Sequence, residues 1–312
     1  MRAVVIDAGR AVVAQRPDPV PGVGEVLVRV RAAGINGADL MQVKGHYPPP
    51  AGTPEDMLGL EMAGEVVELG YGATRFKPKD RVMSLMAGAA QAELAVVHER
   101  ILMPVPDALD WPSAGGLPEV FTTAHDALFS QCGLQPGEHL LVHGAAGGVG
   151  TAAVQLGVAA GARVTATVRN AEHHAAVAAL GATVIAPAGF ADAGPYDVIL
   201  ELVGAPNMPE NLQSLNIGGR ICVIGTGAGA MAQFNLGLLM VRRGRVYGST
   251  LRARPLEAKA QAARAVERSV LPLFASGRLR VPLAAIFELA QAPAAYERFA
   301  QGGKLGKIVL TV

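Results

Sequence analysis

The sequence is poor in aromatic residues, charged residues and cysteine. Phe, Trp and Tyr make up 4% of the 312 residues and charged residues 17%, so the core has to be built from aliphatic side chains. Lysine and arginine total 27 against 26 acids, a net charge of +1. This balance excludes the basic surface that binds nucleic acid or anionic lipid. The two cysteines, Cys132 and Cys222, are too few for a disulfide framework or a four-thiolate zinc site.

Glycine and aliphatic residues are abundant instead. Hydrophobic residues are 51% of the chain and 38 residues are glycine, about 12% against about 7% in average proteins. This composition predicts a sizeable core with close backbone packing, and the length favours two domains. Met1–Ala8 has the pattern of a short strand and not of a secretion signal, so we expect a cytoplasmic protein.

One apolar stretch, Leu140–Ala162, resembles a membrane span because it holds no Asp, Glu, Lys or Arg. It also contains His143, Gln155 and several glycines, and clustered glycines make a poor bilayer helix. We therefore expect a buried strand, a glycine-rich turn and a helix, and no membrane segment.

The first third of the chain has the pattern of short strands separated by turns. Within Glu25–Ala33, Val26, Val28 and Val30 alternate with polar residues, the period-two pattern of a half-buried strand. Similar strands are expected at Arg2–Asp7, Glu65–Leu69, Arg81–Leu85 and Glu93–Val97. Prolines and glycines lie between them, which predicts an antiparallel, partly barrel-like domain with long loops.

From about Trp111 onward, apolar strands alternate with helices. The expected strands are Leu140–His143, Arg163–Val168, Thr183–Ile185, Asp197–Leu200, Arg220–Ile224 and Arg245–Gly248. The expected helices are Val149–Ala160, Ala171–Leu180 and a segment near Met208–Leu215. This alternation predicts an α/β, doubly wound parallel sheet with helices on both faces. After it we expect a helix over Leu256–Ala275 and a last strand over Lys307–Val312 that returns to the first domain.

A glycine motif lies between the first of these strands and its helix. Gly144, Gly147 and Gly150 have the spacing G-x-x-G-x-x-G. A turn without side chains lets the backbone approach a pyrophosphate, whose charge the helix N-terminus stabilises. Because the spacing differs from G-x-G-x-x-G, an ordinary tight turn is the alternative; the flanking strand and helix favour a dinucleotide site. The cofactor-binding residues predicted here are Ala146, Gly147, Gly148 and Val149.

The strand after this turn bears on the choice between the two nicotinamide cofactors. NAD-binding proteins place an acid at its end, about 20 residues on, whereas Arg163–Val168 ends in Arg169 and Asn170. A guanidinium pairs well with the 2′-phosphate of NADPH, so NADPH is the expected cofactor. Two alternatives stay open: Arg169 as a solvated cation at a helix start, and Asn170 as a helix N-cap.

Further motifs run through nearly the whole chain. They are Gly34–Met41, Gly45–Pro50, Leu58–Glu65, Pro78–Val82, Leu117–Glu119, Thr122–His125, the glycine turn and Gly306–Val309. With them the chain resembles the medium-chain dehydrogenase/reductase superfamily, in the zinc-independent quinone oxidoreductase branch that includes zeta-crystallin. The resemblance implies a Rossmann domain (residues 119–256) inserted into a β-rich GroES-like catalytic domain (residues 1–118 and 257–312). It also implies an active site between these domains and a homodimer joined through the edges of the Rossmann sheets.

The resemblance draws attention to the position of zinc in related alcohol dehydrogenases. Those relatives carry Cys where this chain has Asn36, and His where it has Leu60 ahead of Glu61. Neither replacement suits an N/S zinc site, and the four-cysteine structural lobe is missing as well. Without a Lewis acid to polarise an alcohol, we expect a substrate that already accepts electrons well: a quinone, an enone or another conjugated carbonyl. Glu61 is then expected to be a structural carboxylate.

The resemblance also implies roles for individual residues. Asn36 and Tyr47 match residues near the nicotinamide, where an amide and a phenol hydrogen-bond the cofactor or the acceptor oxygen, and they are the predicted catalytic residues. Thr123 matches a threonine that seats the nicotinamide. Weaker matches to cofactor-proximal positions are Gly225, Thr226 and Lys307. The structural alternatives are an Asn that holds a loop, a packing tyrosine and a helix hydroxyl bonded to the backbone. Asp39 is expected to orient its loop.

The chain departs from the family pattern at several positions. Gly37 stands where Arg often follows the Asn, and His125 stands where an aromatic residue follows Thr-Ala. The family's Lys and Tyr ligands of the 2′-phosphate are replaced by His173 and Pro187. An imidazole is mostly neutral at pH 7, so the NADPH prediction depends mainly on the Arg-Asn pair after the second strand.

Three functions are compatible with these residues. The first is a zinc-independent NADPH-dependent quinone oxidoreductase that acts on quinones or related conjugated carbonyls. The second is reduction of enones or 2-enoyl thioesters by the same hydride chemistry. The third, of another class, is a non-catalytic NADPH-binding protein of the crystallin type. The expected partners are a small quinone or enone substrate and a second copy of the chain, with no nucleic acid and no membrane.

Overall fold

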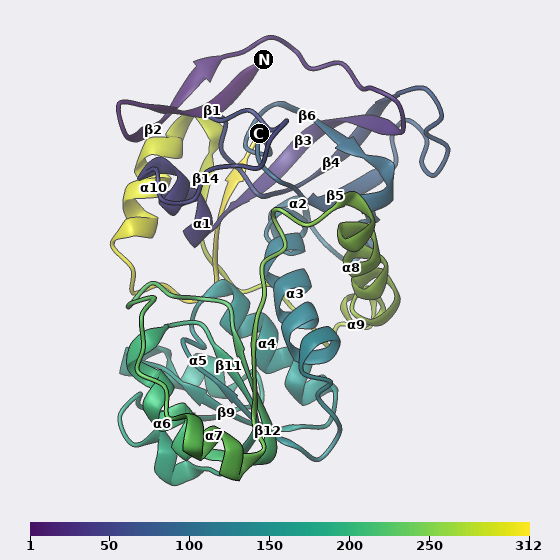
Figure 1. Ribbon diagram of the computed structural model, residues 1–312. Coiled ribbons are helices and arrows are strands. Elements are labelled where there is room, and N and C mark those ends of the chain that lie inside the picture. The colour runs from purple at the N-terminus through teal and green to yellow at the C-terminus, as the bar shows by residue number, and fades with distance from the viewer. The chain divides into compact units, whose positions relative to one another are not determined.

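The computed structural model describes residues 1–312, which fold into two compact units (Figure 1). The split unit combines Met1–Thr122 with Leu251–Val312, and the central unit is Thr123–Thr250. The chain first passes from one to the other within α3 (Pro118–His125). The sequence-based boundaries, after residues 118 and 256, fall a few residues from those of the structure.

The split unit is built on a mostly antiparallel sheet. Six of its strands follow the order β14-β15-β3-β4-β5-β7, β6 pairs with β3, and β1 and β2 form a separate hairpin. The strands are β1 (Arg2–Asp7), β2 (Arg10–Gln15), β3 (Glu25–Ile35), β4 (Glu61–Leu69), β5 (Arg81–Leu85), β6 (Leu94–His98), β7 (Met103–Pro104), β14 (Leu283–Glu288) and β15 (Lys307–Thr311). Aliphatic side chains such as Val28, Met62 and Val82 fill the core beside it. The expected β-rich domain is therefore confirmed.

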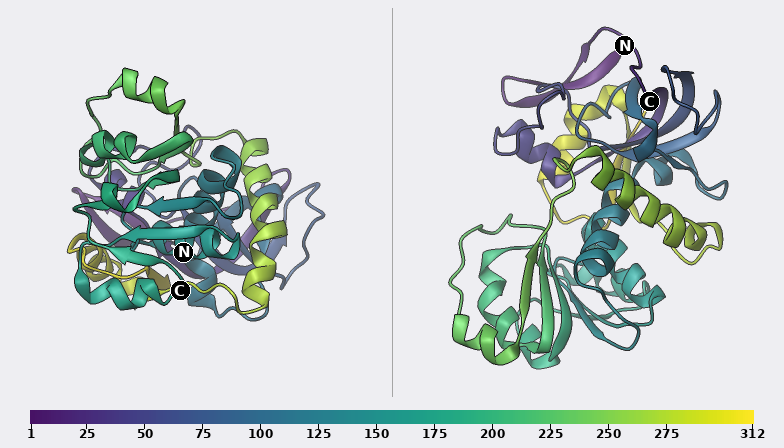
Figure 2. Two further views of the ribbon diagram at one scale, coloured as in Figure 1. Left: turned by 90° about the horizontal axis from the view of Figure 1, so that it is seen from below. Right: turned by 45° about the vertical axis from the view of Figure 1, so that its right-hand side comes forward.

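The helices of the split unit come from both of its chain segments. Besides α3 they are α1 (Gly37–Val43), α2 (Trp111–Gly115), α8 (Leu256–Ser269), α9 (Leu271–Ala275) and α10 (Ala292–Ala300). The single helix predicted over Leu256–Ala275 is wrong: it breaks at Val270 into α8 and α9 (Figure 2). Pro272 explains the break, because its ring clashes with the preceding turn and it lacks an N–H. The sequence analysis also missed β14 and α10.

The central unit contains a six-stranded sheet whose pairs are all parallel, in the order β10-β9-β8-β11-β12-β13. Its strands are β8 (His139–Val142), β9 (Arg163–Thr167), β10 (Thr183–Ile185), β11 (Tyr196–Glu201), β12 (Leu215–Val223) and β13 (Arg245–Gly248). The helices are α4 (Gly148–Ala159), α5 (His174–Ala178), α6 (Met208–Gln213) and α7 (Leu236–Arg242). Helices cover both faces of the sheet (Figures 1 and 2). The strand order reverses between β8 and β11, which confirms the predicted doubly wound fold.

Two local predictions in the central unit have different outcomes. The expected helix Ala171–Leu180 is shorter than predicted, a 3-10 turn at Ala171–His173 followed by α5. It ends before Gly181, whose φ of +101° is left-handed. The apolar stretch Leu140–Ala162 folds as strand, turn and helix, as predicted. No helix in the structure is both long enough and apolar enough to span a bilayer.

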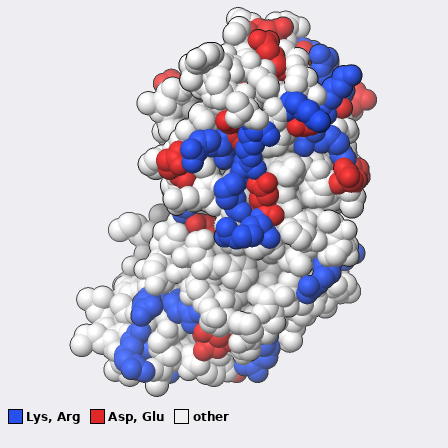
Figure 3. Space-filling view, turned by 90° about the vertical axis from the view of Figure 1, so that its right-hand side faces the viewer, with Lys and Arg blue, Asp and Glu red and all other residues white.

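The charged residues around α8 form pairs of opposite sign. Arg75 pairs with Glu267 and Arg100 with Glu257, each at 2.6 Å, and Arg264 reaches Glu267 at 3.0 Å. Figure 3 shows blue and red atoms side by side on this face. Such pairs near the surface contribute little stability each.

Candidate active site

The turn between β8 and α4 places bare backbone at the start of a long helix. Gly144 has φ +62°, and Gly147 is the N-cap of α4 without a side chain to cap it. A Cβ at Gly150 would lie 2.5 Å from the carbonyl oxygen of Gly144, so the helix approaches the turn closely only because residue 150 is glycine. The first N–H groups of α4 have no intrahelical acceptor and no capping side chain, which is the arrangement that binds a phosphate.

Other predicted cofactor residues follow neighbouring strands of the same sheet. Arg169 and Asn170 come after β9, and Gly225 and Thr226 come after β12. The carboxyl ends of parallel strands meet at one edge of a sheet, so these residues share an edge with the glycine turn. In an open α/β sheet, this edge at the reversal of strand order is where ligands bind.

Of the two predicted residues that follow β9, Asn170 has a structural role and Arg169 does not. Asn170 caps the 3-10 turn that follows it, because its side-chain oxygen accepts from the Glu172 N–H at 3.1 Å. The N-cap alternative for Asn170 is therefore confirmed. Arg169 is exposed and its guanidinium makes no ion pair within the chain, so it is free to meet an anion.

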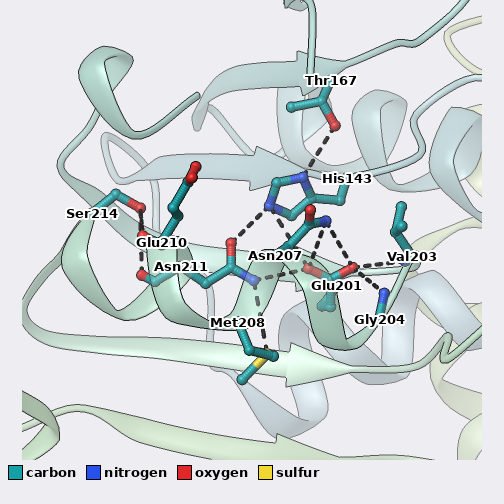
Figure 4. A network of polar contacts seen from close by, with 10 residues as sticks. All are labelled: His143, Thr167, Glu201, Val203, Gly204, Asn207, Met208, Glu210, Asn211 and Ser214. Atoms are coloured by element: carbon teal, nitrogen blue, oxygen red, sulfur yellow. Dashed lines mark hydrogen bonds and ion pairs between the residues drawn. The ribbon is translucent and has the colours of Figure 1, made fainter. Parts of the chain in front are cut away.

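A buried carboxylate, Glu201, ends β11 at the reversal of strand order (Figure 4). Four neutral N–H donors surround it. Its Oε1 accepts from the backbone N–H groups of Val203 at 2.7 Å and Gly204 at 2.8 Å. Its Oε2 accepts from the side-chain amides of Asn211 at 2.8 Å and Asn207 at 3.1 Å. These bonds compensate the loss of water around the charge.

His143 adjoins this network from the turn directly after β8, the strand next to β11. The amide of Asn211 donates to Glu201, so its oxygen faces His143 Nε2 at 2.8 Å and that nitrogen carries the hydrogen. His143 Nδ1 then accepts from the Thr167 hydroxyl at 3.1 Å. Burial lowers the pKa of His143 although Glu201 opposes the shift. The neutral imidazole of His143 is therefore held in place by hydrogen bonds to Asn211 and Thr167 and does not neutralise the charge of the carboxylate.

Glu201 holds the two loops that follow β11 and β12. Its carboxylate binds the first loop, and its backbone oxygen accepts from the N–H groups of Ile224 at 2.9 Å and Gly225 at 3.1 Å. A Cβ at Gly225 would lie 2.3 Å from the Leu202 oxygen, so the loops approach this closely only with glycine there. Glu201 thereby positions the predicted cofactor residues Gly225 and Thr226.

In the split unit, a buried cluster joins Asn36, Glu61 and Lys307, which are 5%, 0% and 2% exposed. The ammonium of Lys307 lies 2.6 Å from Glu61 Oε1, 2.5 Å from Asn36 Oδ1 and 3.0 Å from the backbone oxygen of Ile35. Asn36 Nδ2 donates to Glu61 Oε1 at 3.0 Å, and the backbone N–H of Glu119 donates to Oε2 at 2.8 Å. The ammonium has two hydrogen-bond acceptors and an ion-pair partner within the chain, so we expect Lys307 to act on a cofactor only through Asn36.

Strand pairing brings these three residues together. β15 and β4 flank β3 on opposite sides, both antiparallel to it, with Ile308 opposite Ile35 and Ala63 opposite Ala32. The first residues of β15 and β4 therefore lie beside the last residue of β3, next to Asn36. A Cβ at Gly34 would lie 2.1 Å from Glu61 Oε1, so this carboxylate fits only against glycine.

Asp39, at the start of α1, is fully buried and holds two loop segments. One carboxylate oxygen accepts from the Asn36 N–H at 2.8 Å and the other from the Gly59 N–H at 3.1 Å. Burial raises its pKa from 3.8 to about 6, and these backbone donors and Lys307 limit the rise. The contacts agree with the expectation that Asp39 orients its loop.

Arg252, a residue that the sequence analysis did not single out, contacts both the ring and the backbone of Tyr47. The guanidinium of Arg252 lies 5.0 Å from the centre of the Tyr47 ring and donates to its backbone oxygen at 2.8 Å. It also donates to the Ala87 oxygen at 2.6 Å and to the side chain of Gln42. Burial raises the pKa of Tyr47 despite the nearby cation, so its phenol stays protonated at neutral pH.

The predicted site residues therefore form two groups, one in each unit. In the split unit Asn36 and Lys307 are in contact, whereas Tyr47 connects to α1 only through Arg252 and Gln42. In the central unit the predicted residues lie at one edge of the sheet, and Thr123, 8% exposed, lies in α3.

Two parts of this arrangement were missed from the sequence. Glu201 had a signal, an acid that directly follows the apolar run Val198–Leu200 at the end of β11. Arg252 had none, because it binds backbone oxygens of Tyr47 and Ala87, far away along the chain.

The donor set around Glu61 is unlike a zinc site. Its neighbours are an amide and an ammonium, whereas zinc prefers thiolate and imidazole ligands. No three His, Cys, Asp or Glu side chains gather into a possible metal site anywhere in the structure.

Two family models match the chain in the order that the two units require. The alcohol dehydrogenase GroES-like domain matches residues 22–107, and the zinc-binding dehydrogenase model matches residues 148–268. The chain is 31% identical to acryloyl-coenzyme A reductase of Metallosphaera sedula, with 100% of both proteins covered. It is 30% identical to quinone oxidoreductase of Rattus norvegicus, over 94% of this chain and 90% of that protein.

Other relatives are much longer than this chain. The polyketide synthase protein NorB of Streptomyces orinoci is 36% identical over 93% of the chain, which spans only 13% of that protein. Among solved structures, an alcohol dehydrogenase superfamily protein from Novosphingobium aromaticivorans has a TM-score of 0.89 and 28% identity, covering 100% of this chain and 99% of that one. Quinone oxidoreductase of Pseudomonas syringae has a TM-score of 0.86 and 27% identity, with the same coverage.

The fold and the matched domains define an α/β protein with a GroES-like unit and a Rossmann unit. The chain belongs to the medium-chain dehydrogenase/reductase superfamily. Proteins of this family bind nicotinamide cofactors, and the glycine turn before α4 has the bare helix start that such a cofactor's pyrophosphate requires.

Proposed function

We propose that this chain is a zinc-independent, NADPH-dependent reductase of quinones or related conjugated carbonyls. The observation that carries the proposal is the environment of Glu61, which consists of the amide of Asn36, where zinc-dependent relatives carry Cys, and the ammonium of Lys307. Side chains of this kind do not supply a Lewis acid. They suit an acceptor that needs none, such as a carbonyl conjugated with a double bond.

The cofactor's pyrophosphate would be held over the glycine turn, by the amides of the segment from Ala146 to Val149. When bound, NADPH supplies the hydride. Arg169 is the candidate for the 2′-phosphate, because Asn170 already caps the next turn. Replacing Arg169→Glu should weaken NADPH binding tenfold or more, about 1.4 kcal/mol, and leave NADH binding unchanged in a fluorescence titration. Unchanged NADPH affinity would show that another group binds this phosphate.

Tyr47 and Asn36 are the proposed catalytic residues. A phenol O–H and an amide N–H stabilise charge that develops on the acceptor oxygen, and burial keeps the phenol protonated. Thr123, Gly225 and Thr226 would seat the nicotinamide. Glu119 lies near enough to oppose ionisation of Tyr47, and we assign the final proton to water.

A second candidate function is reduction of 2-enoyl thioesters or enones. The full-length match to an acryloyl-coenzyme A reductase and the matches within polyketide synthases favour it. The hydride chemistry and the proposed roles of Tyr47 and Asn36 are the same. A non-catalytic NADPH-binding protein is the third candidate, with the same cofactor site and no turnover.

A homodimer is proposed through the edge strand β13 of the central sheet. On α7, which precedes this strand, Leu236, Met240 and Val241 are 67%, 76% and 74% exposed. β13 pairs only on its β12 side. An open strand edge next to exposed aliphatic side chains is typical of a surface that a second subunit covers.

The test of function is NADPH oxidation with a panel of quinones, enones and 2-enoyl thioesters. Turnover with quinones supports the first proposal. Fast reduction of enones or 2-enoyl thioesters without quinone turnover assigns the second function. Tight NADPH binding with no turnover of any acceptor assigns the third.

A further inference from the structure

We propose that Lys307 and Glu61 are positioning residues that lock the side-chain amide of Asn36 in one orientation and turn its remaining N–H into a fixed hydrogen-bond donor to a carbonyl oxygen of the bound ligand. The oxygen belongs either to the substrate or to the carboxamide of the nicotinamide. The inference deepens the proposed function and rests on it.

The charges on either side of Asn36 leave only one orientation of its amide. Oδ1 lies 2.5 Å from the ammonium of Lys307, and Nδ2 lies 3.0 Å from a carboxylate oxygen of Glu61. A flipped amide would put its NH2 group against the ammonium and its oxygen against the carboxylate, two repulsive contacts in a buried site. The orientation of the amide is therefore set by the ion pair.

The donor capacity left on Asn36 follows from a count of its hydrogen bonds. An amide side chain has two N–H donors and two acceptor lone pairs. One N–H serves Glu61 and one lone pair serves Lys307. A ligand group that donated to the second lone pair of Oδ1 would have to approach the ammonium of Lys307. The second N–H, in contrast, has no partner in the chain. A ligand oxygen is the group that this N–H fits.

Further contacts fix the positions of both side chains of the ion pair. Lys307 and Glu61 are almost completely buried, and the ammonium has a third acceptor in the Ile35 oxygen. The Glu119 N–H fixes the other carboxylate oxygen. A buried pair costs desolvation and is weak evidence for stability; its value here is that it holds the amide of Asn36 in a single state.

The first test reads the amide itself, by NMR of protein labelled with ¹⁵N at asparagine side chains. Asn36→Asp identifies the signal by its loss. We expect one Asn36 N–H, bonded to Glu61, to be shifted downfield and protected from exchange in the free protein. The other should shift when ligand binds. One sample receives NADPH alone and another NADP⁺ with a quinone or an enone, so the two arms distinguish a cofactor oxygen from a substrate oxygen.

The variants separate positioning from mere stability. The double variant Lys307→Met/Glu61→Gln removes both charges with little change of volume, and it should lose the protected N–H. Lys304→Met is the matched control, because Lys304 is a neighbouring, mostly buried lysine that donates to the Gly306 oxygen and does not touch Asn36. It should leave the Asn36 signals unchanged.

Kinetics give a second readout that a structural role would not produce. Asn36→Asp keeps an acceptor for Lys307 but removes both N–H donors, so kcat should fall by about 10² or more, as for loss of one oxyanion donor. The double variant should lower kcat about tenfold with NADPH affinity unchanged.

Two results would overturn the inference. One is an Asn36 amide that moves with neither ligand although NADPH binds. The other is a double variant with the wild-type amide signals. Failure of the wild-type protein to bind NADPH would instead contradict the proposed function, while the signals of the free protein would still test the locked orientation.

Discussion

Each unit of the molecule buries a glutamate at its candidate site, and the two are satisfied in opposite ways. Glu61 in the split unit faces a cation, the ammonium of Lys307. Glu201 in the central unit faces only neutral donors, two backbone N–H groups and two side-chain amides, next to a neutral histidine. An ion pair imposes polarity on a neighbouring amide. A set of neutral donors fixes the course of the loop that follows β11.

Because their partners differ, the two glutamates have different roles within the proposed reductase. The charged cluster orients one side chain, Asn36, while the neutral network fixes the loop after β11, against which Gly225 packs. Substitutions at the two glutamates should therefore have different effects. Changes at Glu201 should lower the free energy of unfolding and the affinity for the cofactor, whereas removal of both charges of the Glu61–Lys307 pair should mainly lower kcat.

The largest effect is expected for Glu201→Ala. Four buried donors lose their acceptor, at about 1 kcal/mol or more each, so the free energy of unfolding should fall by about 5 kcal/mol. NADPH affinity should fall with it because the loop after β11, against which Gly225 packs, loosens. Chemical denaturation measures the first and fluorescence titration the second. Glu210→Ala, an exposed glutamate of α6, is the control. An effect below about 1 kcal/mol would mean that the carboxylate of Glu201 does not hold the loop after β11.

Breaking the pair in the split unit comes next. Lys307→Met leaves the carboxylate of Glu61 buried without its cation, and the free energy of unfolding should fall by about 3–4 kcal/mol. Adding Glu61→Gln should restore most of this loss, since removing both charges is often neutral. A double-mutant cycle from urea denaturation measures the coupling. Additive losses would show that the two groups do not interact as the 2.6 Å contact implies.

Asp39 provides a pH-dependent contrast within the split unit. Its pKa is about 6 in the folded protein against 3.8 as the reference value. Between these values the folded state binds more protons, so the unfolding free energy falls as pH rises. The difference between wild type and Asp39→Asn should fall by about 2.4 kcal/mol from pH 4 to pH 7 and then level off. Denaturation curves across this range measure it, and a difference that rises with pH would have the wrong sign.

The two sheets also differ at their edges. Met240 lies on α7 beside the edge strand β13, and Ile286 is half-exposed on β14, the edge strand of the split unit. Met240→Lys should raise the dimer dissociation constant tenfold or more, about 1.4 kcal/mol, and Ile286→Lys should leave it unchanged. Light scattering over a dilution series measures both. A wild-type monomer at all concentrations, or equal effects of the two variants, would remove β13 from the proposed interface.

Patterns that are local in sequence predicted much of the central unit. The alternation of apolar strands and helices, and the glycines between β8 and α4, gave its doubly wound sheet and its bare helix start. Each of these features depends on neighbours within about 20 residues. The boundary errors lie where a proline or a left-handed glycine ends a helix, as at Pro272 and Gly181.

Contacts between distant segments account for what the sequence analysis missed. Lys307 meets Glu61 only because β15 and β4 lie on either side of β3, and no spacing in the sequence encodes that pairing. Arg252 binds backbone oxygens, which leave no trace in residue types. The resemblance drew attention to Asn36, Tyr47 and Lys307 but could not show which of their hydrogen bonds are already used.

Turnover by metal-free protein tests the central claim most directly. Protein dialysed against a chelator, with its metal content measured, is assayed for NADPH oxidation with quinones, enones and 2-enoyl thioesters. The account predicts turnover of at least one acceptor without stoichiometric metal and no increase on adding zinc, because Asn36 and Lys307 fill the surroundings of Glu61. No turnover in the metal-free protein, with activity restored by one equivalent of zinc, would contradict it.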